Sequence, residues 1–228
     1  MSKAEIAGLI SKSWKILTPE QRDFLYDQLT VRTYRRNEII FKQGDEPLYM
    51  MYLVKGSVKI YYENESERRQ IMHIAVPSQF FGYRAYFARR HYSTNACPFE
   101  TSTLIFIPLK CIEIILHENN DFANQFIHFL AEELGLSDRH NVILNKIHIR
   151  GRLAEALLFL KDNYGTESDK HTLRLALTRE DLASFSNMNP ANCIRTLSAF
   201  ADEGLIAVNQ RHIALLNERK LKKIAMLG

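Results

Sequence analysis

The part of the chain that most constrains its fold is residues 177–215, where the pattern is helix, tight turn, helix and hairpin. Thr178 predicts the start of the first helix, because a threonine hydroxyl can accept from the free N–H groups of a helix N-terminus. Asn189 followed by Pro190 predicts the start of the second helix, since asparagine caps and proline suits the first helical position. Gly204 predicts its end. This order of elements is typical of proteins that read duplex DNA.

The second helix of this block has an apolar side and a polar side at helical spacing. The apolar side, expected to face inward, consists of Ile194, Leu197, Ala199 and Phe200. The side expected to face outward consists of Ala191, Asn192, Arg195 and Ser198. A guanidinium such as that of Arg195 can bind guanine O6 and N7 with two hydrogen bonds. Residues 205–208 and 212–216 predict a two-stranded wing, whose tip carries Arg211 within reach of phosphate.

The distribution of charge supports a nucleic-acid partner without establishing one. Lys and Arg outnumber Asp and Glu by 12 to 9 in residues 150–228, a difference of +3, and by 18 to 17 in residues 1–149, a difference of +1. Helix-turn-helix geometry also occurs in domains that never bind nucleic acid, and Arg195 is then a solvated surface residue.

Length and composition indicate a globular protein with two domains. At 228 residues and 46% hydrophobic content, the chain is long enough for two cores. No apolar run approaches the roughly 20 residues of a membrane helix, and the N-terminus lacks a secretion signal pattern, so a cytoplasmic protein without a membrane partner is expected. Cys97, Cys111 and Cys193 are far apart, and we expect them to be structural.

Residues 31–108 have the pattern of many short strands. The expected strands are residues 38–41, 50–54, 57–62, 70–75 and 103–107, separated by turn residues. Short strands without intervening helices favour a sandwich or jelly roll, which can hold a small ligand between its sheets. Before them, Thr18 and Pro19 predict the start of a helix.

A helical stretch from about residue 121 to residue 148 carries a wider apolar surface than one neighbour can cover. Its apolar residues are Phe122, Phe126, Phe129, Leu130, Leu134, Ile143, Leu144 and Ile147. One part is expected to cover the β domain, and the rest to pack against the same helix of a second chain, with burial in one chain as the alternative. The residues expected to interrupt that seam are Glu133, Gly135, Ser137, His140 and Asn141. A dimer would suit palindromic DNA, because two reading helices then meet two half-sites.

Six short motifs, in order along the chain, resemble the Crp/Fnr family of bacterial transcription regulators. They are residues 38–45 (EIIFKQGD), 53–59 (LVKGSVK), 79–82 (QFFG), 151–154 (GRLA), 177–183 (LTREDLA) and 194–197 (IRTL). The resemblance implies an α+β fold with an N-terminal antiparallel jelly-roll (β-roll) domain in residues 1–120, a dimerisation helix in residues 121–149 and a C-terminal winged helix-turn-helix in residues 150–228.

The resemblance also implies a cyclic nucleotide site, from which this sequence departs. In nucleotide-binding members the cassette glycine, here Gly82, is followed by a glutamate that holds the ribose and later by an arginine that holds the cyclic phosphate. Here those places are Tyr83 and Ser93, with Thr94 retained beside Ser93. A buried phosphate without its guanidinium loses a charge-assisted partner worth about 1.5–3 kcal/mol. Cyclic AMP is therefore not expected to bind in the usual pose.

Residues 83–92 (YRAYFARRHY) nevertheless pack three tyrosines and three arginines into ten positions. Either Arg84 or a neighbour replaces the missing cation and the tyrosines stack on a different anionic or aromatic effector, or these are surface arginines and half-buried aromatics. By family position, Ser137 could point into the same pocket. The residues expected to bind an unidentified small effector are Gly82, Tyr83, Arg84, Ser93, Thr94 and Ser137.

Metal-based sensors and enzymes fit the sequence less well. Three scattered cysteines cannot hold an iron–sulfur cluster within one chain, whereas composition leaves haem open through His73, His91, His140 and His148. A cupin-like metalloenzyme would need paired histidines with a carboxylate, and residues 31–108 contain only His73 and His91. No arrangement of nucleophile, base and oxyanion donors is found, so no catalytic or metal site and no cofactor is assigned.

The sequence thus predicts a homodimeric regulator of transcription that binds a palindromic double-stranded operator, with RNA polymerase as a further partner. A small effector in the β-roll would control it, and the alternative is a β-roll without effector that serves only as a dimerisation scaffold. The residues expected to bind DNA are Thr178, Asn189, Pro190, Ala191, Asn192, Arg195 and Arg211. Asn192 suits adenine, Arg195 suits guanine and Ala191 suits a thymine methyl group.

Overall fold

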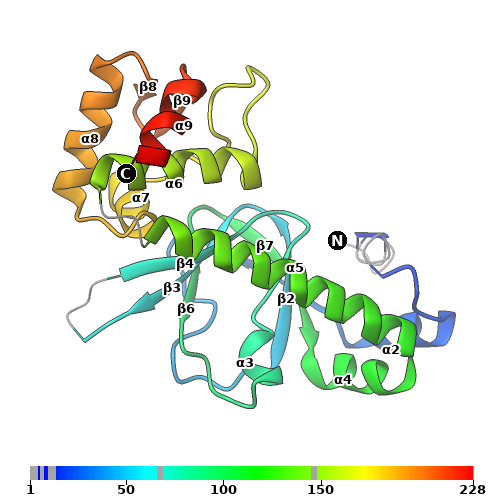
Figure 1. Cartoon of the computed structure of the whole chain (residues 1–228). Coiled ribbons are helices and arrows are strands. Elements are labelled where there is room, and N and C mark those ends of the chain that lie inside the picture. The colour runs from blue at the N-terminus through cyan, green and yellow to red at the C-terminus, as the bar shows by residue number, and fades with distance from the viewer. Residues whose placement is uncertain (1–4, 6–7, 10–13, 66–68, 145–147, 228) are drawn as a thin grey trace. The chain divides into compact units, whose positions relative to one another are not determined.

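The structure, a computed structural model, describes residues 5, 8–9, 14–65, 69–144 and 148–227 of the chain (Figure 1). Contacts within the chain divide it into two compact units. The first comprises residues 1–68 and 73–134, and the second comprises residues 69–72 and 135–228.

In the first unit, helix α2 (Pro19–Gln28) starts where the sequence predicts. The Thr18 hydroxyl accepts from the Gln21 backbone N–H, and the Gln21 side chain accepts from the Thr18 N–H, both over 3.3 Å. This reciprocal pair is a capping box, and Pro19 occupies the first helical position.

Residues 30–108 form seven strands, which confirms the expected β-sheet domain. They are β1 (Thr30–Tyr34), β2 (Tyr49–Lys55), β3 (Val58–Glu63), β4 (Arg69–Ala75), β5 (Phe80–Phe81), β6 (Asn95–Pro98) and β7 (Ser102–Pro108). One sheet has the order β1-β7-β2-β5 and the other the order β4-β3-β6. The pairs β1·β7, β2·β7, β2·β5 and β3·β6 are antiparallel.

The central strands β2 and β7 are buried on both faces. Because successive side chains of a strand point to opposite faces, Met51 and Leu53 of β2 enter one apolar cluster while Met50 and Tyr52 enter another. The cluster that holds Met51 and Leu53 also contains Val58 from β3, and it therefore fills the space within the β-roll. The run YMMYLVK is consequently almost continuously apolar rather than alternating.

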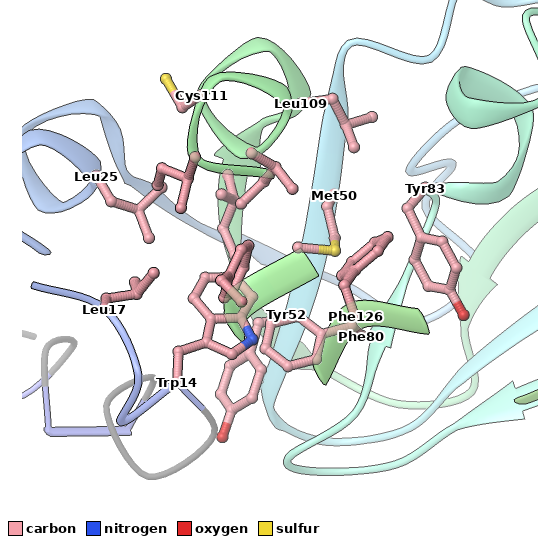
Figure 2. Packing of buried hydrophobic residues seen from close by; sticks show 14 of the residues in the cluster. Trp14, Leu17, Leu25, Met50, Tyr52, Phe80, Tyr83, Leu109, Cys111 and Phe126 are labelled. Atoms are coloured by element: carbon pink, nitrogen blue, oxygen red, sulfur yellow. The ribbon is translucent and has the colours of Figure 1, made fainter. Parts of the chain in front are cut away.

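The other cluster packs helices against the outer face of the four-stranded sheet (Figure 2). Leu25 of α2 lies in it, together with Ile112 of α4 (Leu109–Glu118) and Phe122 of α5 (Asn120–Leu144). Trp14 stacks on Phe80 of β5, with ring centroids 4.9 Å apart and planes 7° apart. The expectation that one side of the long helix covers the β domain is confirmed for Phe122 and for Phe126, which are both buried.

Several local predictions for the β-sheet domain and for α5 are wrong. Residues 38–41 do not form a strand, because only Phe41 makes an isolated bridge, to Ala96. The sequence also missed β1, β6 and the helices α3 (Arg84–Phe87) and α4. On α5, Glu133 and His140 do not interrupt an outer seam, since their residues are only 9% and 5% exposed.

The second unit contains the predicted helix-turn-helix and wing. Its main elements are α6 (Ile149–Tyr164), α7 (Arg179–Phe185), α8 (Pro190–Asp202), β8 (Ile206–Asn209), β9 (His212–Leu215) and α9 (Glu218–Leu227). Gly204 follows α8 with φ +67°, a left-handed conformation that glycine adopts without strain. The core of this unit includes four fully buried side chains, Leu157 of α6, Phe185 of α7, Phe200 of α8 and Leu221 of α9. The sequence had not assigned α9.

Candidate nucleic-acid interface and ligand pocket

Hydrogen bonds cap the starts of α7 and α8 and hold the turn between these helices. The Thr178 hydroxyl accepts from the Asp181 N–H over 3.0 Å and donates to the Asp181 carboxylate over 2.6 Å. Asn189 Oδ1 accepts from the Asn192 N–H over 2.7 Å, which caps α8 as predicted. Between the helices Asn187 has φ +50°, and its carbonyl accepts from Arg152 of α6 over 3.0 Å. Both predicted caps are therefore present, and each capping side-chain oxygen accepts from a helix N–H.

One side of α8 is exposed and differs from the prediction at one position. Ala191, Arg195 and Ser198 are exposed and Asn192 is half-buried, as expected for an outward side. Ile194 is 47% exposed and lies on this outward side, so its assignment to the inner face is wrong. Cys193, Thr196, Leu197 and Phe200 are the buried positions that hold the helix to its unit. At helical spacing these four residues already complete the inner face, which leaves Ile194 outside it.

Asn192 and Arg195 contact each other on the outward side of α8. The Arg195 Nη2 donates to Asn192 Oδ1, one turn earlier on the helix. This bond engages the oxygen that Asn192 would need to accept from adenine N6, although a carbonyl oxygen has two lone pairs. It also directs the guanidinium along the exposed face, where Pro190 at the first helical position is likewise exposed.

The wing is a two-stranded hairpin attached to the start of α7. Asn209 pairs with His212 across the tip, and Gln210 has φ +53°. The Arg179 Nη2 donates to the Gln210 carbonyl over 2.7 Å and so joins the tip to the first residue of α7. Arg211 at the tip is exposed, as predicted. The sequence reasoning missed Arg179, because a contact 31 residues away leaves no periodic signal.

The space beside Gly82 in the first unit is filled by side chains. Gly82 has φ +86°, and a Cβ added to it would lie 2.3 Å from Met51 Cε and 3.2 Å from the Tyr49 carbonyl oxygen. The hydroxyl of the buried Tyr92 donates to the Gly82 carbonyl over 2.9 Å. The Tyr92 ring stacks on Phe41, with centroids 3.9 Å apart. The backbone of the cassette thus packs directly against the protein's own core.

Tyr83, at the place of the ribose-binding glutamate, faces helix α5. Its residue is 1% exposed, and its ring centroid lies 5.2 Å from that of Phe129. The Tyr83 hydroxyl donates to Glu133 Oε2 over 3.3 Å, and Arg84 Nη2 donates to the same oxygen over 3.2 Å. Burial, followed by the nearby Glu133 carboxylate, raises the pKa of Tyr83, so its hydroxyl stays protonated as a donor. Glu133 is a further residue that the sequence reasoning did not assign to this group.

The remaining effector candidates are spread over different surroundings. Ser93 is exposed and Thr94 is half-buried, both in the segment before β6. Ser137 is half-buried on α5 and belongs to the second compact unit. The Arg84 guanidinium, proposed as a replacement cation, is already paired with Glu133. The structure therefore brings together Gly82, Tyr83 and Arg84 but engages each of them in contacts within the chain.

Metal-binding groups do not gather in the described part of the chain. No cluster of three or more His, Cys, Asp or Glu side chains suited to a metal occurs there. Cys97, Cys111 and Cys193 are buried and are not joined in disulfides, and burial raises the pKa of the Cys193 thiol to about 11. His140, one of the four haem candidates, has Nε2 3.0 Å from the Phe185 carbonyl oxygen, and its ring stacks on Phe185. No helix of the described residues has the length and apolar character needed to cross a membrane.

Comparisons with known proteins match both units. The family described as cyclic nucleotide-binding domain matches residues 31–119, and the Crp-like helix-turn-helix domain matches residues 151–224. The anaerobic regulatory protein of Aggregatibacter actinomycetemcomitans is 22% identical over 192 residues, which is 84% of this chain and 74% of that protein. The transcriptional regulatory protein btr of Bordetella pertussis is 28% identical over 184 residues, or 79% of this chain and 75% of that protein.

A solved structure shows the same fold. FixK2 from Bradyrhizobium japonicum has a TM-score of 0.78 at 21% identity, covering 86% of this chain and 96% of its own. The chain has a β-sheet domain, then a long helix, then a winged helix-turn-helix, as the sequence motifs imply. The two domain matches agree with the same motifs. The chain therefore belongs to the Crp/Fnr family of transcription regulators.

Proposed function

We propose that this protein is a cytoplasmic homodimer that binds a palindromic operator through α8 and the wing and so regulates transcription together with RNA polymerase. Members of the Crp/Fnr family are transcription regulators rather than enzymes. The observation that carries the proposal is the exposed side of α8, on which Arg195, Ala191 and Ile194 project from a helix whose opposite side is buried. A side of this kind fits the major groove of B-DNA.

Each residue on this surface has a role that follows from its chemistry. Arg195, directed by Asn192, binds guanine O6 and N7, and Ala191 lies against a thymine methyl group. Thr178, Asn189 and Pro190 form the helix starts nearest the phosphates, while Arg211 contacts phosphate from the wing. The +3 charge of residues 150–228 adds modest non-specific attraction.

The dimer interface in this proposal is an apolar stripe on α5. Ile127 and Leu134, seven residues apart, are 61% and 62% exposed, and the smaller Ala131 lies exposed between them. Val142, further along the same helix, is 57% exposed. A spacing of seven or eight residues keeps side chains on one side of a helix, which is the pattern of a helix that packs against a copy of itself.

For the β-roll we propose the role of a fixed scaffold, with no cyclic nucleotide in the usual pose. The filled space beside Gly82, the buried Tyr83 and the pairing of Arg84 with Glu133 support this choice over an effector within the roll. We propose the domain limits as residues 1–120, 121–149 and 150–228. Titration with cyclic AMP is expected to give no saturable binding at micromolar concentrations.

The experiment that tests DNA reading is Arg195→Ala, with Arg219→Ala on α9 as a matched control for the loss of an exposed arginine. An operator is first selected from random duplexes with the unaltered protein. Fluorescence anisotropy then gives Kd for this operator and for a scrambled duplex. Loss of a bidentate contact to guanine should weaken operator binding by about 1–3 kcal/mol, or roughly 5- to 150-fold, and leave binding to the scrambled duplex nearly unchanged. An equal loss on both duplexes would falsify base reading by Arg195.

A further inference from the structure

The tyrosines and arginines of residues 83–92 divide into an inner and an outer group. Tyr83 and Tyr92 are buried in the first unit, at 1% and 7% exposure. Arg89, Arg90 and His91 follow the short helix α3 and are exposed. The outer group has no part in the filled space beside Gly82, and its cations face solvent on the surface of the unit.

These outer residues line a surface hollow of about 470 Å³. Three segments that are separate in sequence contribute to it: the loop before β2 through Glu46 and Pro47, the α3 region, and helix α4 through Glu113. Its volume lies within the range of about 300–1,000 Å³ that is usual for small-molecule sites. The hollow is open to solvent and is distinct from the interior of the roll.

The charges that line the hollow balance but do not pair with one another. Two guanidinium groups, of Arg89 and Arg90, face two carboxylates, of Glu46 and Glu113. Among the residues that the structure describes, neither arginine forms an ion pair or a side-chain hydrogen bond, and Glu46 forms none either. A simple anion would be attracted by the arginines and repelled by the carboxylates, whereas a molecule with both charges could satisfy both sets.

Aromatic and apolar groups complete the lining. The Tyr86 hydroxyl donates to Glu113 Oε2 over 2.5 Å, and the Tyr86 ring packs edge-on against Phe87 with centroids 5.3 Å apart. Burial and this hydrogen bond raise the pKa of Tyr86 to about 12, so the hydroxyl keeps its proton at neutral pH. Pro47 adds a rigid apolar wall. A planar ring is the ligand part that such a surface accommodates.

The backbone at the end of α3 fixes the position of the two arginines. Arg89 has φ +54°, a left-handed conformation that is uncommon for a residue with a side chain and costs roughly 1 kcal/mol or more. Its N–H donates to the Tyr86 carbonyl over 2.9 Å, and the Arg90 N–H donates to the Ala85 carbonyl over 2.9 Å. The strained turn places two adjacent guanidinium groups at one edge of the hollow.

We propose that this hollow binds a small zwitterion with an aromatic ring, of the chemical class of an aromatic amino acid. Its carboxylate contacts Arg89 and Arg90, its ammonium group contacts Glu46 or Glu113, and its ring lies against Tyr86 and Phe87. Because the site belongs to the first unit, ligand binding there can be measured without DNA, and its failure is separate from any failure of the DNA-binding proposal.

The test is ligand binding to the full chain by calorimetry and by saturation-transfer NMR, with phenylalanine, tyrosine and tryptophan as probes. For the amino acid that binds best, the analogues without the ammonium group and without the carboxylate are titrated as well; for phenylalanine these are 3-phenylpropionate and 2-phenylethylamine. Protein variants are Arg89→Gln with Arg90→Gln, and Glu46→Gln with Glu113→Gln. The matched control is Arg36→Gln, an exposed arginine of the same unit outside the hollow.

At least one amino acid is expected to bind saturably. Its Kd should be at least tenfold larger for each double variant, and each single-charge analogue should bind the unaltered protein at least tenfold more weakly. Arg36→Gln should bind the amino acid as the unaltered protein does. Thermal melting of the variants shows that they remain folded, since all four altered side chains lie on the surface. No binding of any of the three amino acids overturns the proposal. So does 3-phenylpropionate that binds as tightly as phenylalanine, which would indicate a simple anion site.

Discussion

Truncation of Leu134 to alanine should weaken the dimer while leaving each protomer folded. The Leu134 residue is 62% exposed in the single chain, so its loss removes little from the protomer's own core. Complete burial of a leucine side chain contributes about 1.5–3 kcal/mol, and burial of the exposed 62% therefore contributes about 1–2 kcal/mol in each protomer. The substitution occurs twice per dimer, and the retained Cβ keeps part of the contact. A total loss of about 1.5–3 kcal/mol corresponds to a roughly 10- to 150-fold larger dimer Kd.

Sedimentation equilibrium over a concentration series measures this dissociation constant for the unaltered chain and for Leu134→Ala. Ile114→Ala is the matched control, because Ile114 is a 44% exposed apolar residue on α4 of the same unit. Its dimer Kd should equal that of the unaltered chain, and melting temperatures at low concentration should agree among all three proteins. An equal dimer Kd for Leu134→Ala and the unaltered chain would contradict the assignment of the α5 stripe as the interface.

Two further predictions concern α8 and the end of α5. Replacing the thymines of the selected operator one at a time by deoxyuridine should weaken binding of the unaltered protein at the thymine assigned to Ala191 and at a second thymine, where Ile194 loses contact with one methyl group. Each loss should be roughly 0.8 kcal/mol, about fourfold. Ile194→Ala should keep the first response and lose the second, and two undiminished thymine effects in the variant would refute the contact. Burial lowers the pKa of His140, so below about pH 6.5 the unfolded chain binds a proton more readily than the folded chain. The free energy of unfolding should therefore decrease as the pH decreases below this value. The melting temperature of the unaltered protein should therefore drop more than that of His140→Phe between pH 7.5 and pH 5.5, and parallel pH profiles would show that His140 has no such role.

Local signals in the sequence were sufficient for the DNA-binding block. Thr178, Asn189 and Gly204 mark helix ends through hydrogen bonds and backbone angles that involve only near neighbours in the chain. Such features depend on residue type at short spacing, so a single sequence carries them. The same holds for Thr18 and Pro19 at α2.

The errors occur where the environment of a side chain depends on distant parts of the chain. Ile194 is apolar and near helical spacing from the buried residues, yet four other residues already fill the inner side of α8. Glu133 is charged but buried, because Tyr83 and Arg84, about 50 residues earlier, donate to its carboxylate. Residues 38–41 have the composition of a strand, but only Phe41 finds a β partner. The predicted effector and DNA contacts themselves remain predictions that await binding measurements.

In the proposed complex with DNA, the bond from Arg179 to the Gln210 carbonyl would affect how the wing contacts phosphate. A free hairpin tip would lose conformational entropy on contact with a phosphate, and this loss would subtract from affinity. Here one hydrogen bond already restrains the tip in the folded protein and joins it to the first residue of α7, and Arg211 lies exposed beside it. Loss of this hydrogen bond should make the entropy of DNA binding more unfavourable and leave the enthalpy nearly unchanged. The sequence preference should not change.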